Sequence, residues 1–330
     1  MGFSLSCGVA LCSCNGIKFI NQQLDSIAAQ TVFPQEIVIS DDQSEDGSWS
    51  LIQKWADEIS VSRQISVTLI QNKNRLGVSL NFQQACSKLN TDVIFFCDQD
   101  DIWPTNKIER MLEAFSEPKV MLVHSDARLV DGELADLGLT LFEALHFSNR
   151  ERQLIKQGCF VDIYCRRNLV TGAATAFRRT LLSVASPFPP EWLHDEWLAA
   201  IAATCGRVVM LPDCLLFYRQ HGGNVIGMPV SHMDRIVQSW RRMRSMSRSD
   251  FFQSRICRLE QWYLRVKQLG LANSNDEAMI LGALEHFRRR SRMTADPVGR
   301  LPKIWREFWS GNYKRYSGVV NGVFRDCLNV

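Results

Sequence analysis

Short apolar segments alternate with amphipathic helical segments through the first half of this chain, and this alternation limits the folds that it can adopt. Each apolar segment is rich in β-branched or aromatic residues and is bounded by polar or turn residues, which is typical of buried strands. The predicted strands are residues 5–13, 35–40, 66–70, 93–97 and 120–124.

The segments between these strands carry helical periodicity. Apolar residues recur on one face of each segment, in the second and third of them at positions i, i+3, i+4 and i+7, as expected for a helix that buries one face. The apolar residues of the three predicted helices are Ile20, Leu24, Ile27 and Ala28; Phe82, Ala85, Cys86 and Leu89; and Ile108, Met111, Leu112 and Phe115. A repeated strand–helix–strand order predicts an α/β fold of the doubly wound type, with a mostly parallel sheet flanked by helices.

Charge divides the chain into two parts, for which we predict domains 1–230 and 231–330. The last hundred residues hold 19 Lys and Arg against 9 Asp and Glu, a net charge of +10, whereas residues 1–230 have a net charge of −7. An acidic part suits a site that gathers carboxylates around a cation, and a basic part suits an anionic surface.

Composition excludes several classes of protein. The chain has 330 residues, of which 46% are hydrophobic and 22% charged, so that collagen-like and wholly disordered chains are excluded. No apolar run approaches the roughly 18 residues that a membrane span needs, and the N-terminus carries no export signal. We therefore expect a cytoplasmic protein.

Polar residues follow three of the predicted strands directly. They are Ser13–Gly16 after the first strand, Asp41–Ser48 after the second and Asp98–Asp101 after the fourth. In such sheets ligands bind beyond the carboxyl ends of the strands. Asp and Ser residues also cap helices, but capping explains Asp98 and Asp100 poorly because they stand several residues before the next helix. Like charges placed together favour a cation there.

Two nucleotide-binding motifs are missing from the sequence. No G-x-G-x-x-G follows a predicted strand, and no G-x-x-x-x-G-K-[ST] occurs anywhere. These motifs cradle phosphates in dinucleotide-binding folds and in P-loop proteins. A dinucleotide site and a P-loop are therefore excluded.

Taken in order, the motifs of residues 5–227 resemble those of the inverting, family 2 type glycosyltransferases, which have the GT-A fold of nucleotide-diphospho-sugar transferases. The motifs that carry the resemblance are Ser13–Gly16, Asp25–Ile27 with Gln30–Val38, Asp41–Ser44, Asn74–Gly77 with Asn81, Asp98–Trp103, Thr171–Gly172, His194–Leu198 and Tyr218–Asn224. Within the family, the Asp98–Trp103 and Tyr218–His221 segments are similar to the rhamnosyltransferase branch of bacterial surface-polysaccharide synthesis.

The resemblance implies an enzyme that moves a sugar from a nucleotide-sugar donor, such as dTDP-rhamnose, to an acceptor hydroxyl of O-antigen, capsule or exopolysaccharide. It implies a Mg²⁺ or Mn²⁺ ion held by Asp100, with Asp98 on the ribose or the metal's water shell and His221 as a metal or phosphate ligand. The remaining implied donor-binding residues are Ser13, Asn15, Asp41, Asp42, Arg75, Gly77 and Asn81. The family usually has Pro and Tyr where this chain has Cys12 and Cys14, so the nucleobase stays open.

Inverting transfer needs a base on the acceptor side, because the attacking hydroxyl must lose its proton as the new bond forms. The resemblance gives this role to Asp195, which begins an apolar helical segment where the helix dipole favours a carboxylate. Glu196 is the second candidate. An aspartate at this position also suits a helix cap, and that alternative stays open.

From about residue 229 the sequence predicts helices rich in Arg, Met and aromatic residues. Trp and Arg together are typical of amphipathic helices that lie on a headgroup layer. We therefore predict either a peripheral location at the anionic inner membrane surface, with a lipid-linked saccharide as acceptor, or a helical subdomain that packs its aromatics. No stacking module or reading helix accompanies the arginines, so nucleic acid is not expected as a partner.

Two other functions are compatible with an acidic α/β site. A nucleotidyltransferase that makes a nucleotide-sugar shares such a site, but it normally opens with a Gly-rich basic loop after the first strand, which this chain lacks. An inactive glycosyltransferase-like adaptor is the alternative that is not an enzyme. Hydrolysis of nucleotide-sugars would argue against the adaptor.

Overall fold

The computed structural model describes residues 5–63, 65–222, 246–294 and 296–328. The chain divides into two compact units. The first unit is built from residues 1–147, 170–202 and 206–228, and the second from residues 148–169, 203–205 and 229–330.

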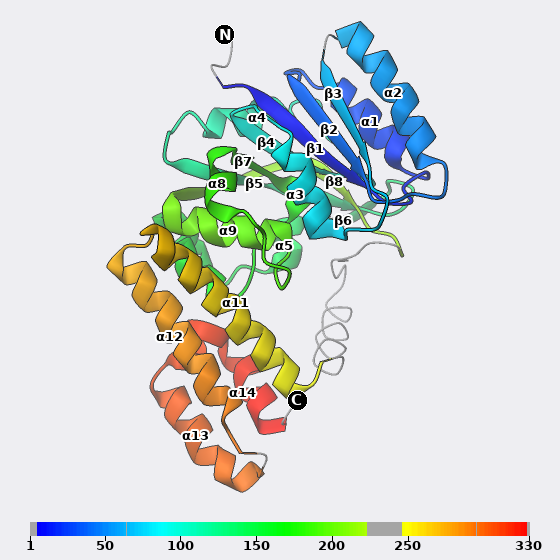
Figure 1. Ribbon diagram of the computed structural model, residues 1–330. Helices are drawn as coiled ribbons and strands as arrows, with labels where there is room; N and C mark the ends of the chain where they lie inside the picture. Colours follow the sequence, from blue (N-terminus) through cyan, green and yellow to red (C-terminus); the bar gives the residue numbers. More distant parts are fainter. Residues whose placement is uncertain (1–4, 64, 223–245, 295, 329–330) are drawn as a thin grey trace. The chain divides into compact units, whose positions relative to one another are not determined.

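The first unit is built on one mixed sheet with the strand order β3-β2-β1-β4-β7-β5-β6, with β8 beside β5 (Figure 1). Its strands are β1 (Cys7–Ser13), β2 (Glu36–Asp41), β3 (Ser66–Gln71), β4 (Val93–Asp98), β5 (Val120–Val130), β6 (Asp136–Thr140), β7 (Thr175–Arg178) and β8 (Arg207–Arg219). Strands β3, β2, β1 and β4 are parallel. The predicted mostly parallel sheet flanked by helices is confirmed.

Parallel register brings the polar ends of the strands into line. Ser13 pairs with Asp41 across β1 and β2, and Cys12 pairs with Asp98 across β1 and β4. The residues that follow these strands therefore emerge at one edge of the sheet. All residues of β1 are buried, as expected for a central strand with helices on both faces.

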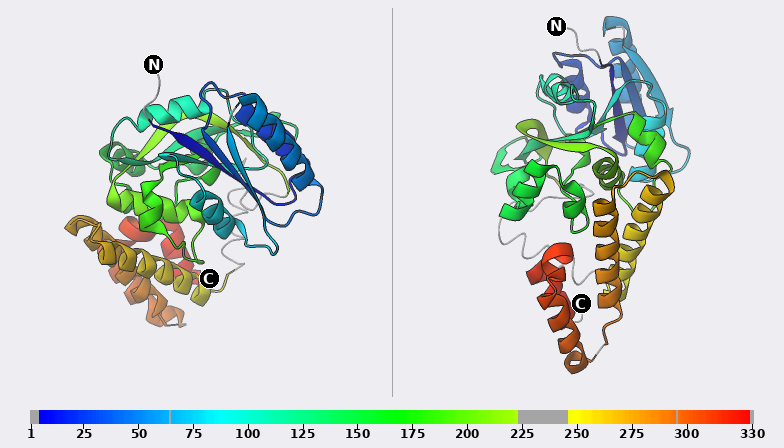
Figure 2. Two further views of the ribbon diagram at one scale, coloured as in Figure 1. Left: turned by 45° about the horizontal axis from the view of Figure 1, so that its top comes forward. Right: turned by 90° about the vertical axis from the view of Figure 1, so that its left-hand side faces the viewer.

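Helices cover both faces of the parallel strands (Figure 2). Alternate strand residues such as Val9 and Phe95 belong to one core cluster with the apolar faces of α1, α2 and α4. On the other face, Phe82 of α3 meets Phe96 of β4 edge to face, with 4.9 Å between ring centroids. The helices are α1 (Ile20–Ala28), α2 (Ser48–Arg63), α3 (Val78–Ser87), α4 (Lys107–Ala114), α5 (Leu141–Leu145), α8 (Thr180–Ala185) and α9 (His194–Cys205), whose last residues belong to the second unit.

Antiparallel pairing extends the sheet beyond β4. Strand β7 lies between β4 and β5 and is antiparallel to both, whereas β8 runs parallel to β5. The chain reaches β7 only after β5 and β6, so β4 and β7 are far apart in the sequence but hydrogen-bonded in the fold. The edge of the sheet near β4 is thus completed by a late segment.

The second unit is helical, as predicted for the C-terminal region. Its helices are α6 (Asn149–Gln157), α7 (Phe160–Tyr164), α11 (Arg248–Leu269), α12 (Ser274–Ser291), α13 (Pro297–Trp309) and α14 (Val319–Leu328), with a π-helical turn at Tyr313–Ser317. No helix in the described ranges is long and apolar enough to span a bilayer. Residues 240–244, part of the predicted Arg-rich helical region, lie outside the described residues, as do residues 223 and 224 of the Tyr218–Asn224 motif.

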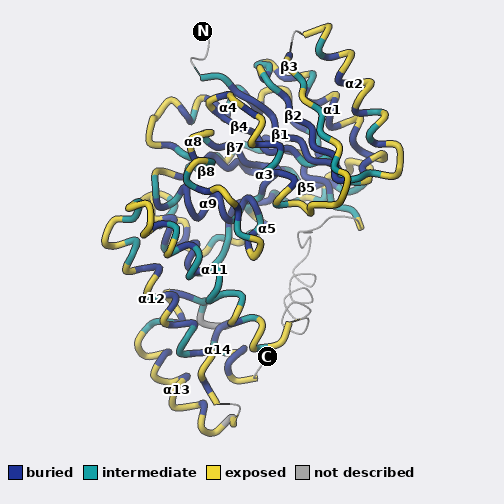
Figure 3. The backbone as a smooth tube through the Cα atoms, in the orientation of Figure 1, coloured by how far each residue is buried: buried dark blue, intermediate teal, exposed yellow. Residues whose placement is uncertain are grey.

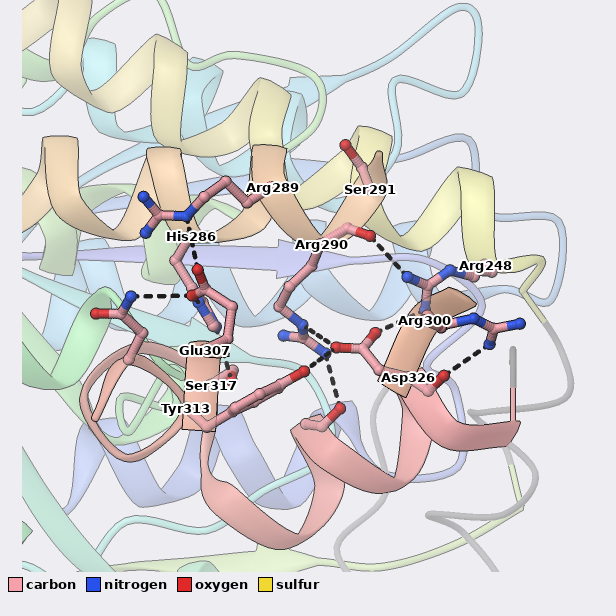
Figure 4. A network of polar contacts seen from close by, with 12 residues as sticks. Arg248, His286, Arg289, Arg290, Ser291, Arg300, Glu307, Tyr313, Ser317 and Asp326 are labelled. Atoms are coloured by element: carbon pink, nitrogen blue, oxygen red, sulfur yellow. Dashed lines mark hydrogen bonds and ion pairs between the residues drawn. The ribbon is translucent and has the colours of Figure 1, made fainter. Parts of the chain in front are cut away.

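A buried polar network connects the helices of the second unit (Figure 4). The carboxylate of Asp326 accepts hydrogen bonds from Arg290 Nε at 2.6 Å, Arg248 Nη1 at 2.6 Å and the Tyr313 hydroxyl at 2.5 Å. Its backbone carbonyl accepts one from Arg300 at 2.7 Å. We call this group the Asp326 network. Arg248 and Arg290 are therefore paired inside the unit.

Candidate active site

Three carboxylates, which we call the acidic cluster, lie at the carboxyl end of β4: Asp98, Asp100 and Asp101. Asp101 is buried, and its Oδ1 accepts a hydrogen bond from the backbone N–H of Arg219 at 2.9 Å. The guanidinium of Arg219 donates to the backbone carbonyl of Asp100 at 2.7 Å. The end of β8 thus fixes the turn that carries the cluster.

Asp100 and His221 are brought together by the end of β8, although they lie 121 positions apart in the chain. The Nε2 atom of His221 is 2.8 Å from Oδ2 of Asp100. The imidazole ring also packs on Phe19, with 4.7 Å between ring centroids. Two residues that the sequence assigned to a metal site therefore lie within contact of each other.

The acidic cluster carries unbalanced negative charge. Burial, together with the charges of Asp100 and Asp195, raises the pKa of Asp98 to about 7. Burial also raises the pKa of Asp101 well above its usual value, with the neighbouring carboxylates adding to the effect. Within the described residues, Oδ2 of Asp101 is buried without a hydrogen-bond partner. A cation brought to this edge of the sheet would lower the energy of the ionised cluster.

Lys107 is a buried cation beside the cluster that the sequence did not reveal. Its Nζ donates to the carbonyl of Ala173 at 2.7 Å and lies 4.4 Å from the centroid of the Trp103 ring. Burial lowers the pKa of Lys107 to about 8, an effect that Asp101 and Asp98 oppose. A lysine in the first turn of an amphipathic helix ordinarily lies in solvent, so the sequence held no signal for this position.

Polar side chains after β1 and β2 are joined to one another. The Ser13 hydroxyl donates to Oδ2 of Asp41 at 2.7 Å, and Oδ1 of Asp41 accepts the N–H of Ser44 at 2.9 Å. Asn15, which has a left-handed backbone with φ of 52°, accepts the N–H of Glu45 at 2.9 Å. The predicted donor residues Ser13, Asn15 and Asp41 are therefore neighbours, and these contacts fix the two loops against each other.

Asp42 holds the loop that follows β3. Its Oδ1 accepts the backbone N–H of Leu76 at 2.7 Å, and its Oδ2 accepts that of Gly77 at 2.9 Å. Gly77 has a φ of 78°, and no atom lies within 4 Å of the place that a Cβ would take, so a ligand can approach this backbone closely. Arg75 is exposed on the same loop. It is near enough to Cys14 to oppose the rise that burial causes in the pKa of that thiol.

Asn81 is buried and its side-chain amide is occupied inside the protein. The Nδ2 atom donates to the carbonyl of Ser40 at 2.9 Å, while Oδ1 accepts the Ser40 hydroxyl at 2.6 Å and the Asn72 amide at 3.0 Å. Asn72 in turn donates to Oδ1 of Asp42 at 3.0 Å. In the structure Asn81 therefore supports the Asp42 loop through Asn72.

Asp195 lies in the first turn of α9 and faces the same side of the sheet as the acidic cluster. Its Oδ2 accepts the N–H of Gly172 at 2.8 Å, and its Oδ1 accepts the N–H of Glu196 at 2.7 Å. Its charge is one of the causes that raise the pKa of Asp98. These two hydrogen bonds fix the orientation of the carboxylate.

His194 supports this turn from within the core. The imidazole stacks on Phe82 at 4.1 Å between centroids and meets Phe96 edge to face at 4.7 Å. Burial lowers the pKa of His194 to about 3, so the ring is neutral near pH 7. A Cβ at position 172 would come within 2.9 Å of its Nε2, so Gly172 allows the close packing that places Asp195.

The side chains at this edge of the sheet fit a divalent cation that takes part of its ligand shell from water and substrate phosphates. Within residues 5–63, 65–222, 246–294 and 296–328, no group of three or more His, Cys, Asp or Glu side chains is arranged to hold a metal by itself. Mg²⁺, however, is commonly held by one or two carboxylates and completes its shell with water and substrate phosphates. Asp98 and Asp100 supply such oxygen atoms, and His221 lies beside them.

Comparison with known proteins identifies the family. Residues 9–182, more than half of the chain, match the sequence profile of Glycosyl transferase family 2. This chain belongs to that family. The dTDP-rhamnosyl transferase RfbG of Shigella flexneri is 31% identical to this chain over 231 residues, which cover 66% of this chain and 73% of RfbG.

Two other relatives share a smaller fraction of identical residues with this chain. An uncharacterized glycosyltransferase of Nostoc sp. is 25% identical over 223 residues, 66% of this chain, and the match spans only 65% of that protein's length. The Escherichia coli enzyme WfaP is named a UDP-Glc:alpha-D-GlcNAc-diphosphoundecaprenol beta-1,3-glucosyltransferase. It is 25% identical over 203 residues, 61% of this chain and 72% of that enzyme.

Solved structures share the fold. Staphylococcus aureus TarS 1–349 in complex with UDP-GlcNAc has a TM-score of 0.57 at 14% identity, with 91% of this chain and 81% of that chain covered. The mannosyltransferase PcManGT from Pyrobaculum calidifontis, in complex with GDP-Man and Mn²⁺, has a TM-score of 0.54 at 16% identity, with 98% and 81% covered. The predicted GT-A fold is thus confirmed.

Proposed function

We propose that this chain transfers a sugar from a nucleotide-sugar donor to an acceptor hydroxyl with inversion at the anomeric carbon. The observation that carries the proposal is the arrangement at the carboxyl ends of the strands. The acidic cluster after β4, the Asp42 loop and the oriented carboxylate of Asp195 all line one side of the sheet. The cluster suits the donor's diphosphate with a cation, and Asp195 suits the acceptor.

On the donor side, we assign Asp100 and Asp98 to a Mg²⁺ or Mn²⁺ ion, with His221 as a third ligand or a phosphate ligand. When bound, the cation would neutralise the diphosphate that leaves. Asp42 and the exposed backbone of Gly77 would meet the base and ribose, and Arg75 would approach the diphosphate. We assign Ser13, Asn15, Asp41 and Asn81 to shaping this pocket, since their side chains join its loops.

On the acceptor side, we assign Asp195 the role of general base. The acceptor hydroxyl would give its proton to this carboxylate as its oxygen bonds to the anomeric carbon. The bond between that carbon and the diphosphate oxygen breaks, and the nucleoside diphosphate leaves. A carboxylate already held by two backbone N–H groups needs little reorganisation for this step.

For the substrates, we propose dTDP-rhamnose as donor and a lipid-linked saccharide of surface-polysaccharide synthesis as acceptor. The relative from Shigella flexneri is named a dTDP-rhamnosyl transferase. The name of WfaP gives a saccharide on diphosphoundecaprenol, a lipid, as its acceptor. An acceptor on a lipid favours a peripheral location at the inner membrane. In this scheme residues 1–230 are the catalytic domain, and residues 231–330 meet the membrane.

Metal-dependent donor turnover tests the proposal. The protein is mixed with dTDP-rhamnose, UDP-glucose or GDP-mannose, with Mn²⁺ or with EDTA, and thermal stabilisation and released nucleoside diphosphate are measured. We expect one donor to stabilise the protein and to be turned over only with the cation. Asp100→Ala should lose both effects, whereas Asp57→Ala, an exposed carboxylate on α2, should lose neither. An active Asp100→Ala variant, or full activity in EDTA, would contradict the assignment.

A further inference from the structure

Helix α13 has its polarity reversed. Its buried residues are Arg300 and Glu307 as well as Ile304, and its exposed residues include five large apolar ones. Buried and exposed positions alternate along α13 in Figure 3. Trp305 is 65% exposed and Trp309 is 68% exposed, values far above those of most tryptophans in folded proteins. With Val298, Leu301 and Phe308 they recur every three or four residues, so they form one stripe along the helix. We call these five residues the α13 stripe.

Internal charge pairing explains why the inner face of α13 is polar. Arg300 donates to the carbonyl of Asp326 at 2.7 Å (Figure 4). The carboxylate of Glu307 lies 2.8 Å from Nδ1 of His286 and 2.7 Å from Nε of Arg289. The helix is therefore attached to its unit through hydrogen bonds and ion pairs, and through Ile304 in a small apolar cluster. The α13 stripe is not required for that attachment.

Aromatic rings concentrate at the C-terminal end of the stripe. Trp305 and Trp309 meet edge to face with 5.5 Å between ring centroids, and Phe308 meets Trp309 at 6.0 Å. Tryptophan is enriched where an apolar phase meets water, because its ring is large and apolar while its indole N–H can still bond to polar groups. A cluster of this kind suits the headgroup level of a bilayer.

Exposed charge around the stripe is mostly basic, with the N-cap Asp296 as an exposed acidic residue at the start of α13. Between residues 297 and 328 the acidic residues are Glu307 and Asp326, and both are buried in internal pairs. The exposed charged residues of the same segment are Lys303, Arg306, Lys314 and Arg315. An apolar stripe with basic residues near it is complementary to anionic lipid, which attracts Lys and Arg near the surface.

We propose that α13 lies on the surface of an anionic phospholipid bilayer, with the α13 stripe inserted between the headgroups and Arg306, which flanks the stripe, beside lipid phosphates. This inference deepens the proposed membrane location by naming the element that makes the contact, and it rests on that part of the proposed function. It does not depend on sugar transfer.

Vesicle flotation of the full-length protein tests the proposal. Vesicles of phosphatidylglycerol mixed with phosphatidylcholine are compared with vesicles of phosphatidylcholine alone, at low and at high salt. We expect flotation with the anionic vesicles, weakened by salt, and a roughly tenfold or larger loss in the double variant Trp305→Ala/Trp309→Ala. The control Leu264→Ala removes an equally exposed apolar residue from α11 and should float like the wild type.

Folding, donor turnover and self-association are measured on the wild type and the double variant. The double variant should keep its far-ultraviolet circular dichroism and its donor turnover, because both tryptophans are exposed and lie outside the catalytic assignment. Equal flotation of wild type and double variant would overturn the proposal. So would a wild-type protein that ignores anionic vesicles but forms a dimer in light scattering that the double variant lacks, because the stripe would then bind a second copy. Donor turnover that persists in either case would leave the proposed transfer reaction standing.

Discussion

The acidic cluster of the first unit and the Asp326 network of the second unit are both groups of charges partly or wholly removed from water, but their neighbours differ. Asp326 is bonded by two guanidinium groups and a tyrosine hydroxyl, so its charge is compensated within the protein. The acidic cluster has more carboxylates than cations, and the pKa of Asp98 is raised to about 7 as a result of burial and of this imbalance. A compensated network stabilises a fold, whereas an uncompensated cluster is available to a ligand.

The starts of most helices follow the same division, with two exceptions: Thr140 caps α5 of the first unit, and no side chain caps α7 of the second. Four helices of the second unit start with a side chain that accepts a backbone N–H: Ser148 before α6, Ser247 before α11, Asn273 before α12 and Asp296 before α13. Helices α1, α3, α4 and α9, which follow strand ends or carry the candidate base, start without such a bond. The polar groups of the second unit thus contribute mainly to its own stability.

The largest expected effect comes from breaking the Asp326 network. Asp326→Asn would leave Arg290 and Arg248 without a counter-charge in the interior, which should lower the free energy of unfolding by about 3–5 kcal/mol. Urea denaturation measures the change. The matched control is Glu285→Gln, since Glu285 forms only an exposed pair with Arg289 and should contribute less than about 1 kcal/mol. Equal stability of the two variants would show that the network is not a stabilising one.

In the first unit, the corresponding change should affect catalysis and leave stability almost unchanged. Asp195→Asn keeps the shape and one of the two bonds from backbone N–H groups but cannot accept a proton, so kcat should fall by about 10²-fold or more, equivalent to about 2.7 kcal/mol. Steady-state kinetics with the preferred donor measure this, and donor binding should persist. Glu196→Gln is the neighbouring control. If Glu196→Gln is the inactive variant and Asp195→Asn the active one, the two roles are exchanged.

The pH dependence of stability further distinguishes the acidic cluster from the Asp326 network. Asp98 has a pKa of about 7 in the folded protein against about 4 when unfolded. The folded state then binds more protons between these values, so the metal-free protein should lose stability as the pH rises from about 4 to about 7. Asp98→Asn removes this loss and should be more stable than wild type at pH 8 by at least about 1 kcal/mol.

Thermal unfolding at pH 5 and pH 8, with and without Mn²⁺, checks this expectation. The cation should stabilise the wild type more at pH 8, because carboxylates must be ionised to bind it. Asp98→Asn should respond less. A wild type whose stability is flat between pH 5 and pH 8 would mean that the cluster is compensated after all.

The smallest effect concerns the helix caps. Asn273→Ala removes the side chain that accepts the N–H groups of Asn275 and Asp276, so the second unit should lose about 1 kcal/mol. Asn106 stands at the same position before α4 but makes no such bond, so Asn106→Ala should change stability by a few tenths of a kcal/mol at most. Thermal denaturation of the two alanine variants decides whether the contrast between the units is real.

Local patterns predict the parallel part of the sheet well. The predicted segment 93–97 differs from β4 by one residue at one end, and 35–40 differs from β2 by one residue at each end, because a buried strand of a parallel sheet is a continuous apolar run. Strand β7 is not predicted, since its four residues carry no period that separates them from a loop. Residues 148–169 lie with the C-terminal helices in the second unit, a long-range association that composition does not encode.

The candidate site is predictable to the extent that residues follow strands directly. Asp98 and Asp42 stand out for that reason, whereas His221 comes only from resemblance, because its contact with Asp100 joins distant parts of the chain. Lys107 is not predicted, because a lysine in the first turn of an amphipathic helix suggests an exposed side chain, whereas this one is buried. The inward orientation of the Asn81 side chain is not predicted from the sequence for a related reason, because its partners Ser40 and Asn72 lie on other elements.

The position of β7 between β4 and β5 has a consequence for how the protein folds. The β1–β2 and β2–β3 pairs join strands that are adjacent in sequence, so they can assemble early. The β1–β4, β4–β7 and β5–β8 pairs close long loops, and contacts of that kind form slowly. Because Gly172, which holds Asp195, precedes β7 and Arg219, which holds the acidic cluster, ends β8, the site acquires these supports last. During synthesis, the proposed donor site can therefore begin to form only after most of the first unit has been made.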